Sequence, residues 1–260
     1  MRARRVRRAV PEETPVAMVF DGATLAVMMA SPADIRDFAY GFAVSEGVIA
    51  AKDEVESFEI AEHDAGIEAR FFLREDRGEA LAARRRLLAG PVGCGLCGIE
   101  SLEAALRPLP VLSHPAESGA ALSAADLAGA GEALRLWQRL HDLTRGVHAA
   151  GFLTAEEGIV MAREDVGRHN ALDKLIGALL LAGISPARGA FVLTSRLSVE
   201  LVQKSALAGC PSIVAVSAPT AHALRLAEEA GITVAAFARD GAFELFTHPG
   251  RITTGIPDVA

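Results

Sequence analysis

Cysteine is scarce in this sequence, with only three residues in 260. A small secreted scaffold that relies on disulfides normally uses more cysteines, in an even number. The sequence therefore excludes a disulfide framework. We expect a cytoplasmic protein whose thiols are mostly reduced.

Long apolar runs are absent as well. No stretch of about 18 uninterrupted apolar residues occurs, which predicts no membrane span. Residues 1–8 contain five arginines, but the PEETP segment at 11–15 follows them where a signal peptide would have its apolar core. We therefore expect no export signal and interpret residues 1–10 as a disordered basic tail.

Net positive charge is also missing, since the formal net charge is −7 and the pI is near 5.5. A general nucleic-acid surface would need an excess of Lys and Arg, so we expect no nucleic-acid partner. Hydrophobic residues are plentiful, at 51% of the chain, which is enough for a sizeable buried core.

The first part of the chain, residues 11–107, is predicted to form a small α+β subdomain. Apolar stretches within 16–30 flank an Asp-Gly pair at 21–22, which is typical of a tight β-hairpin turn. Ser31 is expected to cap the helix that follows. Residues 55–74 alternate in polarity and predict a second hairpin.

The second part of the chain has the pattern of an α/β domain. Residues 108–123 are rich in Pro, Ser, Gly and Ala and are predicted to form a linker. Residues 124–260 follow, with a helix at about 124–140 and then an alternation of strands and helices. The expected strands are 158–163, 191–194, 212–217, 232–238 and 243–247, and the expected helices are 170–182, 198–208 and about 220–229.

Three strand-to-helix junctions fall at Asp165–Asn170, Ser195–Ser198 and Ser217–Thr220. In an open α/β sheet such junctions gather at the carboxyl ends of the strands, where ligands bind, and the free N–H groups of helix starts suit phosphates. The sequence thus predicts an anionic-ligand site, although no Walker-type or GxGxxG loop identifies the ligand. An ordinary α/β scaffold with capped helices is the alternative interpretation.

The EDVGRHN segment at 164–170 concentrates polar side chains before a helix, which favours a functional loop over a plain capping loop. Arg168 can bind a phosphate or a carboxylate through two donors, and His169 can donate a hydrogen bond or move a proton near neutral pH. Asp165 is expected either to orient His169 or to accept a hydrogen bond from a purine-like ring. Lys174, one turn into the helix, is expected to add positive charge.

The next junction repeats this combination of hydroxyl and guanidinium groups with Ser195 and Arg196. Glu200 and Lys204 are spaced i,i+4 and are interpreted as an ordinary surface pair. His148 stands alone in an apolar stretch and is expected to be a core histidine.

Two thiols lie in the GCGLCG segment, at Cys94 and Cys97, directly before a predicted helix. A position near a helix N-terminus lowers the pKa of a thiol, as do nearby arginines such as those at 84–86. A structural zinc site would need a second pair of ligands with suitable spacing, which the sequence lacks. A thioredoxin-like redox pair and a persulfide carrier are both compatible with the motif. Cys210 precedes an apolar strand and is predicted to be buried and inert.

With these residues assembled, the chain resembles the FdhD family, the formate dehydrogenase accessory sulfurtransferases, from about Glu12 to Ile252. The motifs that carry the resemblance are EETPVAMVFDG, VMMASPADIRDFAYGF with SEGVI, GCGLCG, TRGVHAAGF, EDVGRHNALDKLIG, SRLSVELVQKSALAGCPSIVAVSAPTA and FTHPGRI. The resemblance implies that Cys94, with Cys97 as helper, carries persulfide sulfur from a cysteine desulfurase. That sulfur would pass to the molybdenum of bis(molybdopterin guanine dinucleotide), the bound substrate, and so activate apo formate dehydrogenase. A homodimer is implied as well.

The same resemblance implies where the substrate binds and which fold binds it. The candidate binding residues are Asp165, Arg168, His169, Ser195, Arg196, Ser217, Phe237, Ala238, Arg239, Asp240, Gly241 and Ala242. The α/β domain would be cytidine-deaminase-like, but Ala150 stands where a zinc deaminase has the glutamate of its H-x-E motif, so zinc deamination is excluded. No permanently bound metal is expected. A non-catalytic cofactor-binding chaperone and a dithiol oxidoreductase are the alternative functions.

Overall fold

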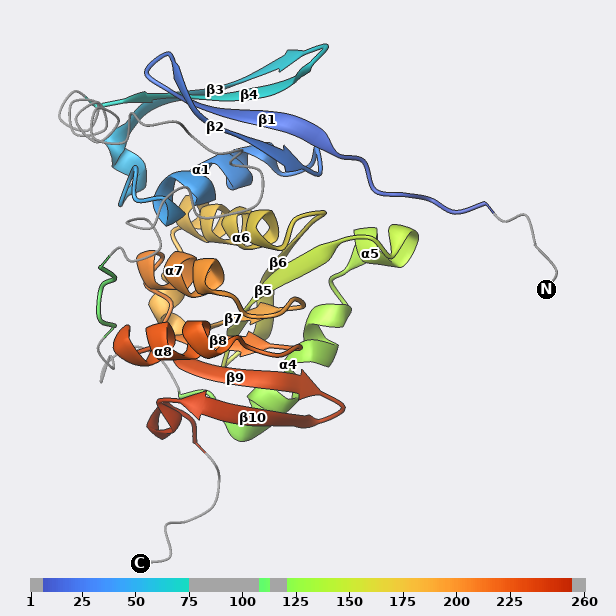
Figure 1. Ribbon diagram of the computed structural model, residues 1–260, viewed down its shortest axis with the longest axis vertical. Coiled ribbons are helices and arrows are strands. Elements are labelled where there is room, and N and C mark those ends of the chain that lie inside the picture. The colour runs from blue at the N-terminus through green and yellow to red at the C-terminus, as the bar shows by residue number, and fades with distance from the viewer. Residues whose placement is uncertain (1–6, 75–107, 113–120, 254–260) are drawn as a thin grey trace, which may run out of the picture.

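Two β-sheets organise the chain in a computed structural model that describes residues 7–74, 108–112 and 121–253 (Figure 1). The first sheet has the strand order β2-β1-β4-β3 and consists of β1 (Thr14–Phe20), β2 (Ala23–Ala30), β3 (Val55–His63) and β4 (Gly66–Leu73). The second has the order β10-β9-β8-β7-β5-β6 and consists of β5 (His148–Thr154), β6 (Gly158–Asp165), β7 (Ala190–Leu193), β8 (Ser212–Ala215), β9 (Thr233–Arg239) and β10 (Ala242–Thr247). Both sheets contain parallel and antiparallel pairs, so the predicted mixed α/β architecture is confirmed.

Helices cover the sheets, and short 3-10 turns link some of the elements. The α-helices are α1 (Ile35–Ser45), α4 (Ala124–Arg135), α5 (Arg139–Thr144), α6 (Arg168–Ala182), α7 (Val199–Leu207) and α8 (Ala221–Glu229). The 3-10 turns are η1 (Lys52–Glu54), η2 (Pro186–Arg188) and η3 (Pro249–Arg251).

Both predicted N-terminal hairpins are confirmed. The turn of the first hairpin consists of Asp21 and Gly22, whose φ angles are 48° and 77°. The favoured two-residue hairpin turn requires positive φ at both positions. The Asp21 carboxylate also accepts a hydrogen bond from the Leu73 N–H at 2.9 Å. This contact ties the first hairpin to the second, where β1 pairs in parallel with β4.

Ser31 does not cap α1, and that prediction is wrong. The helix begins four residues later, after Asp34, and no side chain caps it. The Ser31 hydroxyl instead accepts a hydrogen bond from the Val166 N–H, 135 residues away in sequence. The Ser31 hydroxyl therefore makes a tertiary hydrogen bond instead of capping the helix next to it.

The two halves of the described chain meet where α1 crosses α6. A Cβ atom added to Gly41 would lie 1.6 Å from the Asp173 carbonyl oxygen, and one added to Gly177 would lie 1.9 Å from the Asp37 carbonyl oxygen. The two helix backbones are therefore in direct contact, which only glycine permits. One hydrophobic core continues across this contact, from Phe38 of α1 to the buried residues of the second sheet.

The alternation of strands and helices after residue 155 is confirmed, and the helices lie on both faces of the second sheet (Figure 1). Successive strand residues point to opposite faces, so Ile213 of β8 packs with the core shared by α6, α7 and α8. Its neighbour Val214 packs with the core that α4 covers. The predicted helix 170–182 ends at Gly183, whose φ is 70°.

One prediction in the middle of the chain is wrong, and one strand there was missed. The single helix expected at 124–140 is two helices, because the chain turns at Leu136–Gln138 before α5 begins. The strand β5, which begins at His148 and lies between β6 and β7 inside the sheet, was not predicted. His148, expected to be a core histidine, is only partly buried. The apolar run HAAGFLT of this strand is typical of a strand buried on both faces and equally of a short buried helix.

Candidate ligand site at the carboxyl edge of the second sheet

The three predicted junctions come together at one edge of the second sheet. Strands β7, β8 and β9 are parallel, and β6 and β7 both run antiparallel to β5, so the four strands β6 to β9 end at the same edge. We call this the carboxyl edge. The Leu197 N–H donates to the Ala218 carbonyl at 3.1 Å, and the Phe237 N–H donates to the Ser217 carbonyl at 3.3 Å. The second and third junctions and the β9–β10 hairpin are therefore in direct contact.

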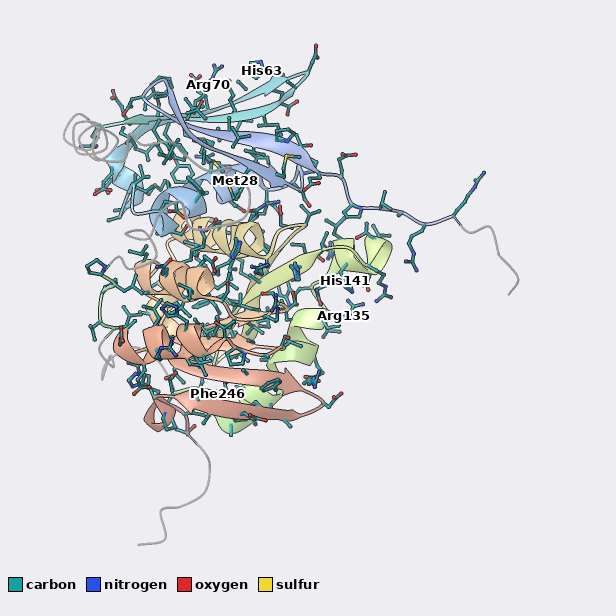
Figure 2. The ribbon with its side chains drawn as sticks, viewed as in Figure 1. Met28, His63, Arg70, Arg135, His141 and Phe246 are labelled. Carbon is teal, nitrogen blue, oxygen red and sulfur yellow. The ribbon has the colours of Figure 1, made fainter. Side chains whose placement is uncertain are left out.

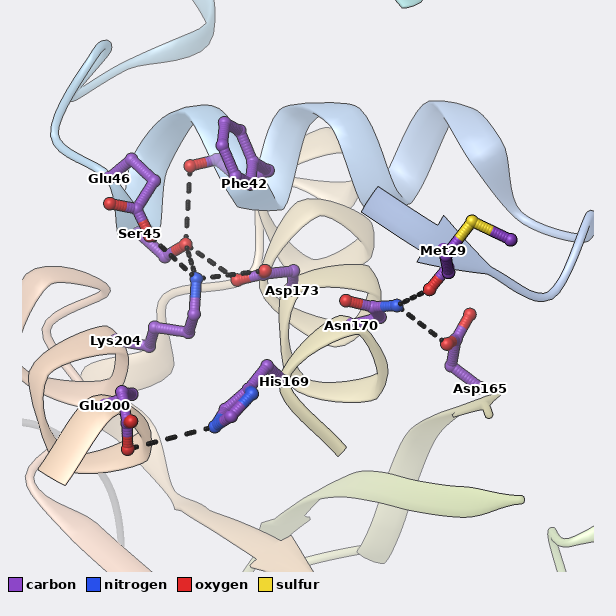
Figure 3. Close-up of polar contacts among 10 residues, drawn as sticks. All are labelled: Met29, Phe42, Ser45, Glu46, Asp165, His169, Asn170, Asp173, Glu200 and Lys204. Carbon is purple, nitrogen blue, oxygen red and sulfur yellow. Dashed lines mark hydrogen bonds and ion pairs between the residues drawn. The ribbon is translucent and has the colours of Figure 1, made fainter. Parts of the chain in front are cut away.

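Asp165 organises the first junction from a fully buried position. One carboxylate oxygen lies 2.7 Å from the Lys174 ammonium and accepts the Ser31 N–H at 2.9 Å. The other oxygen accepts the Gly167 N–H at 2.8 Å and the Asn170 amide at 2.9 Å (Figure 3). With four donors on two oxygens, Asp165 holds the loop in place, and its contacts are to Lys174 rather than to His169.

Lys174 is fully buried, and the prediction that it adds charge to the ligand site is wrong. Its ammonium donates to the Ser31 carbonyl at 2.9 Å besides pairing with Asp165. A buried ammonium with a paired carboxylate contributes no net charge to the surface. Lys174 and Asp165 together join the end of β2 to the start of α6.

The first turn of α6 is open to an anion. No side chain caps the helix at Gly167, and no acidic residue stands in the first turn. A Cβ atom at Gly167 would lie 2.8 Å from the Asn170 amide nitrogen, so glycine lets the loop close over the helix start. The 15-residue helix therefore presents its positive dipole end to the carboxyl edge, with the partly buried Arg168 as its first residue.

His169 lies between α6 and α7 and is neutral at neutral pH. Burial, with the nearby charges of Arg168 and Lys204, lowers the pKa of His169 to about 4. Its Nε2 atom is 3.9 Å from the Glu200 carboxylate and has no hydrogen-bond partner among the described residues (Figure 3). The imidazole therefore acts here as a neutral donor or acceptor and not as a cation. Because His169 lies in the first junction and Glu200 follows the second, this contact places the two junctions next to each other.

One turn further along α6 from His169, a buried polar cluster joins three helices. Lys204 of α7 lies 3.0 Å from the Asp173 carboxylate of α6 and 3.1 Å from that of Glu46, directly after α1 (Figure 3). The Ser45 hydroxyl donates to Asp173 at 2.6 Å and lies 2.8 Å from Lys204. The surface pair predicted for Lys204 and Glu200 is therefore wrong, because Lys204 points inward, toward α1 and α6.

The remaining predicted ligand residues differ in how far they reach solvent. Arg196, Arg239, Asp240, Gly241 and Ala242 are exposed at the carboxyl edge, and Ser217 and Phe237 are partly buried there. Ser195 is buried, with its hydroxyl donating to the Arg196 carbonyl at 3.1 Å, and Ala238 is fully buried. The side chains of Ser195 and Ala238 therefore point into the protein interior, and their backbone atoms form part of the loops at the carboxyl edge.

The β9–β10 hairpin carries backbone strain at this edge. Phe237 has a φ of 54°, in the left-handed region that a bulky residue rarely occupies. Asp240 and Gly241, with φ of 55° and 73°, form the turn of the hairpin, where positive φ is usual. The Asp240 N–H donates to the Glu132 carboxylate of α4 at 3.0 Å, which helps to hold the turn. Such strain clusters at ligand-binding sites, where the surrounding structure enforces it.

Several residues of the site network were missed by sequence reasoning. Glu164 accepts the N–H groups of Leu140 and His141 at 2.7 and 2.8 Å and so fixes the start of α5. Ser45 and Glu46 reach Lys204 across more than 150 residues. No local pattern signals such long-range partners.

The cysteines separate into two groups. Cys94 and Cys97 lie outside the described residues. Cys210 is fully buried, and burial raises the pKa of its thiol to about 12. The prediction that Cys210 is buried is confirmed, and the raised pKa of its thiol disfavours the reactive thiolate.

No cluster of three or more His, Cys, Asp or Glu side chains in the described ranges could hold a metal ion. Among the helices of those same ranges, none combines the length and the apolar character needed to span a bilayer.

Comparison with known proteins gives a consistent result along almost the whole chain. The model of the FdhD/NarQ family matches residues 11–253. The chain is 52% identical over 245 residues to the sulfur carrier protein FdhD of Agrobacterium fabrum, covering 94% of this chain and 89% of that protein. It is 46% identical over 243 residues to the protein of the same name from Cupriavidus necator, covering 94% of this chain and 83% of that protein. A crystal structure of a putative formate dehydrogenase accessory protein from Desulfotalea psychrophila aligns with a TM-score of 0.70 and 25% identity, over 94% of this chain and 90% of that one.

Proposed function

The chain belongs to the FdhD/NarQ family, and on this basis we propose that it is a sulfur carrier for formate dehydrogenase. In this role it accepts sulfur from a cysteine desulfurase and delivers it to the molybdenum of bis(molybdopterin guanine dinucleotide). The observation that supports the proposal most directly is the match to proteins named as sulfur carriers over 94% of the chain. The open helix start at the carboxyl edge adds an independent physical argument.

The phosphates of the substrate bind, in this proposal, at the carboxyl edge. The uncapped N-terminus of α6 offers backbone donors and a positive dipole end, and no carboxylate in its first turn opposes an anion. Arg168 stands at this helix start, while Arg196 and Arg239 are exposed on the two neighbouring loops. Guanidinium groups form two parallel hydrogen bonds to phosphate, so these three residues suit a diphosphate. His169, which is neutral, supplies a hydrogen bond there and no charge.

Sulfur loading requires one thiol exchange. The Cys94 thiolate attacks the outer sulfur of a desulfurase persulfide, a new S–S bond forms on Cys94, and the desulfurase cysteine leaves as a thiolate. For release, the Cys97 thiolate attacks the inner sulfur of the Cys94 persulfide, a Cys94–Cys97 disulfide forms, and the terminal sulfur leaves as hydrosulfide for the bound substrate. This assignment of roles to Cys94 and Cys97 follows the family resemblance.

Loading can be tested by mass spectrometry. The protein is incubated with a cysteine desulfurase and L-cysteine, and the intact mass is measured for wild type, Cys94→Ala, Cys97→Ala and Cys210→Ala. We expect an added mass of one sulfur atom in wild type and Cys210→Ala, and no such adduct in Cys94→Ala. An adduct that persists in Cys94→Ala contradicts the proposal.

Activation of formate dehydrogenase in cells separates sulfur transfer from the two alternatives. A chaperone that only binds the cofactor would still activate the enzyme as Cys94→Ala, whereas a sulfur carrier would not. A dithiol oxidoreductase would turn over in an NADPH-coupled insulin reduction assay, in which we expect little activity. Either a functional Cys94→Ala or rapid insulin reduction would refute sulfur transfer.

The proposal includes a homodimer, a cytoplasmic location and a cytidine-deaminase-like α/β half. The six-stranded sheet with helices on both faces supports this fold assignment. Analytical ultracentrifugation of the full chain measures the oligomeric state directly.

A further inference from the structure

An apolar and basic surface flanks the carboxyl edge at the junction of α4 and α5. Nine large hydrophobic side chains are exposed among the described residues, and four of them lie in this corner. They are Leu136 at 85%, Val10 at 77%, Leu143 at 69% and Trp137 at 45% of full exposure. Isolated exposed hydrophobic residues need no explanation, but a group of them marks an interaction site.

Contacts between backbone and side chains bring these residues together. Arg135 of α4 pairs with Asp142 of α5, so the end of α4 lies beside α5. Leu136 and Trp137 stand in the turn between the two helices, and Leu143 is in α5. A Cβ atom at Gly146 would lie 3.1 Å from the Pro11 ring, which places the N-terminal arm beside the end of α5 (Figure 1).

The same corner carries positive charge. Arg139 and Arg145 are exposed on α5 and at its end, while Asp142 between them is paired with Arg135. On the arm, the exposed Arg7 and Arg8 are balanced by the exposed Glu12 and Glu13, so the excess positive charge of the corner comes from Arg139 and Arg145. Arg135 and His141 of this corner are both labelled in Figure 2, on the side of the molecule where α4 and α5 meet. We call the set Leu136, Trp137, Arg139, Leu143 and Arg145 the α4–α5 surface. It combines a tryptophan, two leucines and two arginines in a chain whose net charge is −7.

Hydrogen bonds connect the α4–α5 surface to the ligand loops on both sides. The α5 N-terminus donates to Glu164, the residue directly before Asp165. Glu132 of α4 accepts the Asp240 N–H of the β9–β10 hairpin. A partner that docks on the α4–α5 surface therefore lies against the opening of the carboxyl edge, where it can receive the bound ligand.

We propose that the α4–α5 surface is the docking site for the protein that receives the ligand, through a partner surface with an apolar centre and an acidic rim. Tryptophan and arginine are the residues that contribute most to binding energy at protein interfaces, and exposed arginines attract carboxylates and accelerate association. Under the proposed function, on which this inference rests, the partner is apo formate dehydrogenase. A sulfur donor needs only the thiol loop, whereas the ligand acceptor has to reach the carboxyl edge.

The test measures binding of purified apo formate dehydrogenase from the same organism to the full-length protein. The surface variants are Leu143→Ser, Trp137→Ala and the double change Arg139→Glu/Arg145→Glu. Matched controls are Ile60→Ser and Lys52→Glu, which alter exposed residues of the other sheet and its flank. Thermal unfolding and guanine nucleotide binding are measured for every variant.

We expect each surface variant to weaken binding of the apoenzyme roughly tenfold or more, and the controls to stay within about twofold of wild type. Added salt is expected to weaken the wild-type complex, and to affect the double arginine variant less. Nucleotide binding, sulfur loading and thermal stability are expected to stay as in wild type.

Four results would overturn the inference. The surface variants could bind the apoenzyme as wild type does, or the wild type could fail to bind it at all. The variants could instead lose binding to vesicles containing acidic lipid, or lose self-association, which would assign the surface to a membrane or to a second copy. Sulfur loading on Cys94 and activation of formate dehydrogenase are read separately, so failure of the proposed function is distinguished from failure of this docking surface.

Discussion

Replacing Lys174 with Met tests the buried ion pair that holds the ligand loop. Lys174 and Asp165 are both fully buried, with their charged atoms 2.7 Å apart. Removing one partner of such a pair leaves an uncompensated buried charge, which costs about 3–5 kcal/mol. Domains of this kind are stable by about 5–15 kcal/mol, so Lys174→Met should remain folded but lose a large share of its stability. With a slope of about 3 kcal/mol per molar urea, the unfolding midpoint should fall by roughly 1–1.7 M.

Urea unfolding followed by circular dichroism measures this loss, and Lys52→Met is the matched control. Lys52 is exposed, so the same chemical change there should alter the free energy of unfolding by less than about 0.5 kcal/mol. The double variant Asp165→Asn/Lys174→Met should recover part of the loss, because no unpaired charge remains. If Lys174→Met costs no more than Lys52→Met, the assignment of a structural ion pair beneath the ligand loop is refuted.

Three further predictions concern pH, helix packing and the ligand. The pKa of His169 is about 4 in the folded protein and near 6.5 in the unfolded chain. Between these two pH values the unfolded chain binds more protons, so the free energy of unfolding should fall by up to roughly 3 kcal/mol as the pH drops from 6.5 to 4. His169→Gln should lose this part of the slope in urea titrations at pH 7, 6 and 5; an unchanged slope contradicts the neutral buried imidazole. Gly177→Ala should lower the free energy of unfolding by about 3 kcal/mol or more, since its Cβ would lie 1.9 Å from a backbone oxygen. Gly129→Ala, with open space around its Cβ, should raise it by up to about 1 kcal/mol; calorimetric unfolding of both variants measures the difference. Arg239→Ala should weaken binding of a guanine nucleotide by roughly 10- to 100-fold in titration calorimetry. The control is Arg188→Ala, which changes an exposed residue before β7 at the opposite edge of the sheet and should leave the affinity unchanged. If the two variants bind the nucleotide equally well, Arg239 is not part of the site.

Local patterns were sufficient wherever one segment determined its own structure. The Asp-Gly pair at 21–22 specified the first hairpin because its two residues tolerate positive φ. The alternation of apolar runs and helical segments after residue 155 predicted β6 to β10 and their helices in the correct order. The three junctions were expected at one sheet edge, since parallel strands end together. The strand directions confirm this for all three, and backbone contacts join the second and third.

The sequence alone thus determined the family, the mixed α/β architecture and the position of the candidate ligand edge. The tertiary structure decided which polar side chains are free to act there. Lys204 and Lys174 look like surface cations in the sequence, yet both are buried. Lys174 pairs with Asp165 at the end of β6. Lys204 pairs with Asp173 of α6 and with Glu46, which follows α1 and is 158 positions away in the sequence. Local spacing records which residues are neighbours on one helix, and only the packing of α1 against α6 and α7 determines which charges pair with one another and which remain for a ligand.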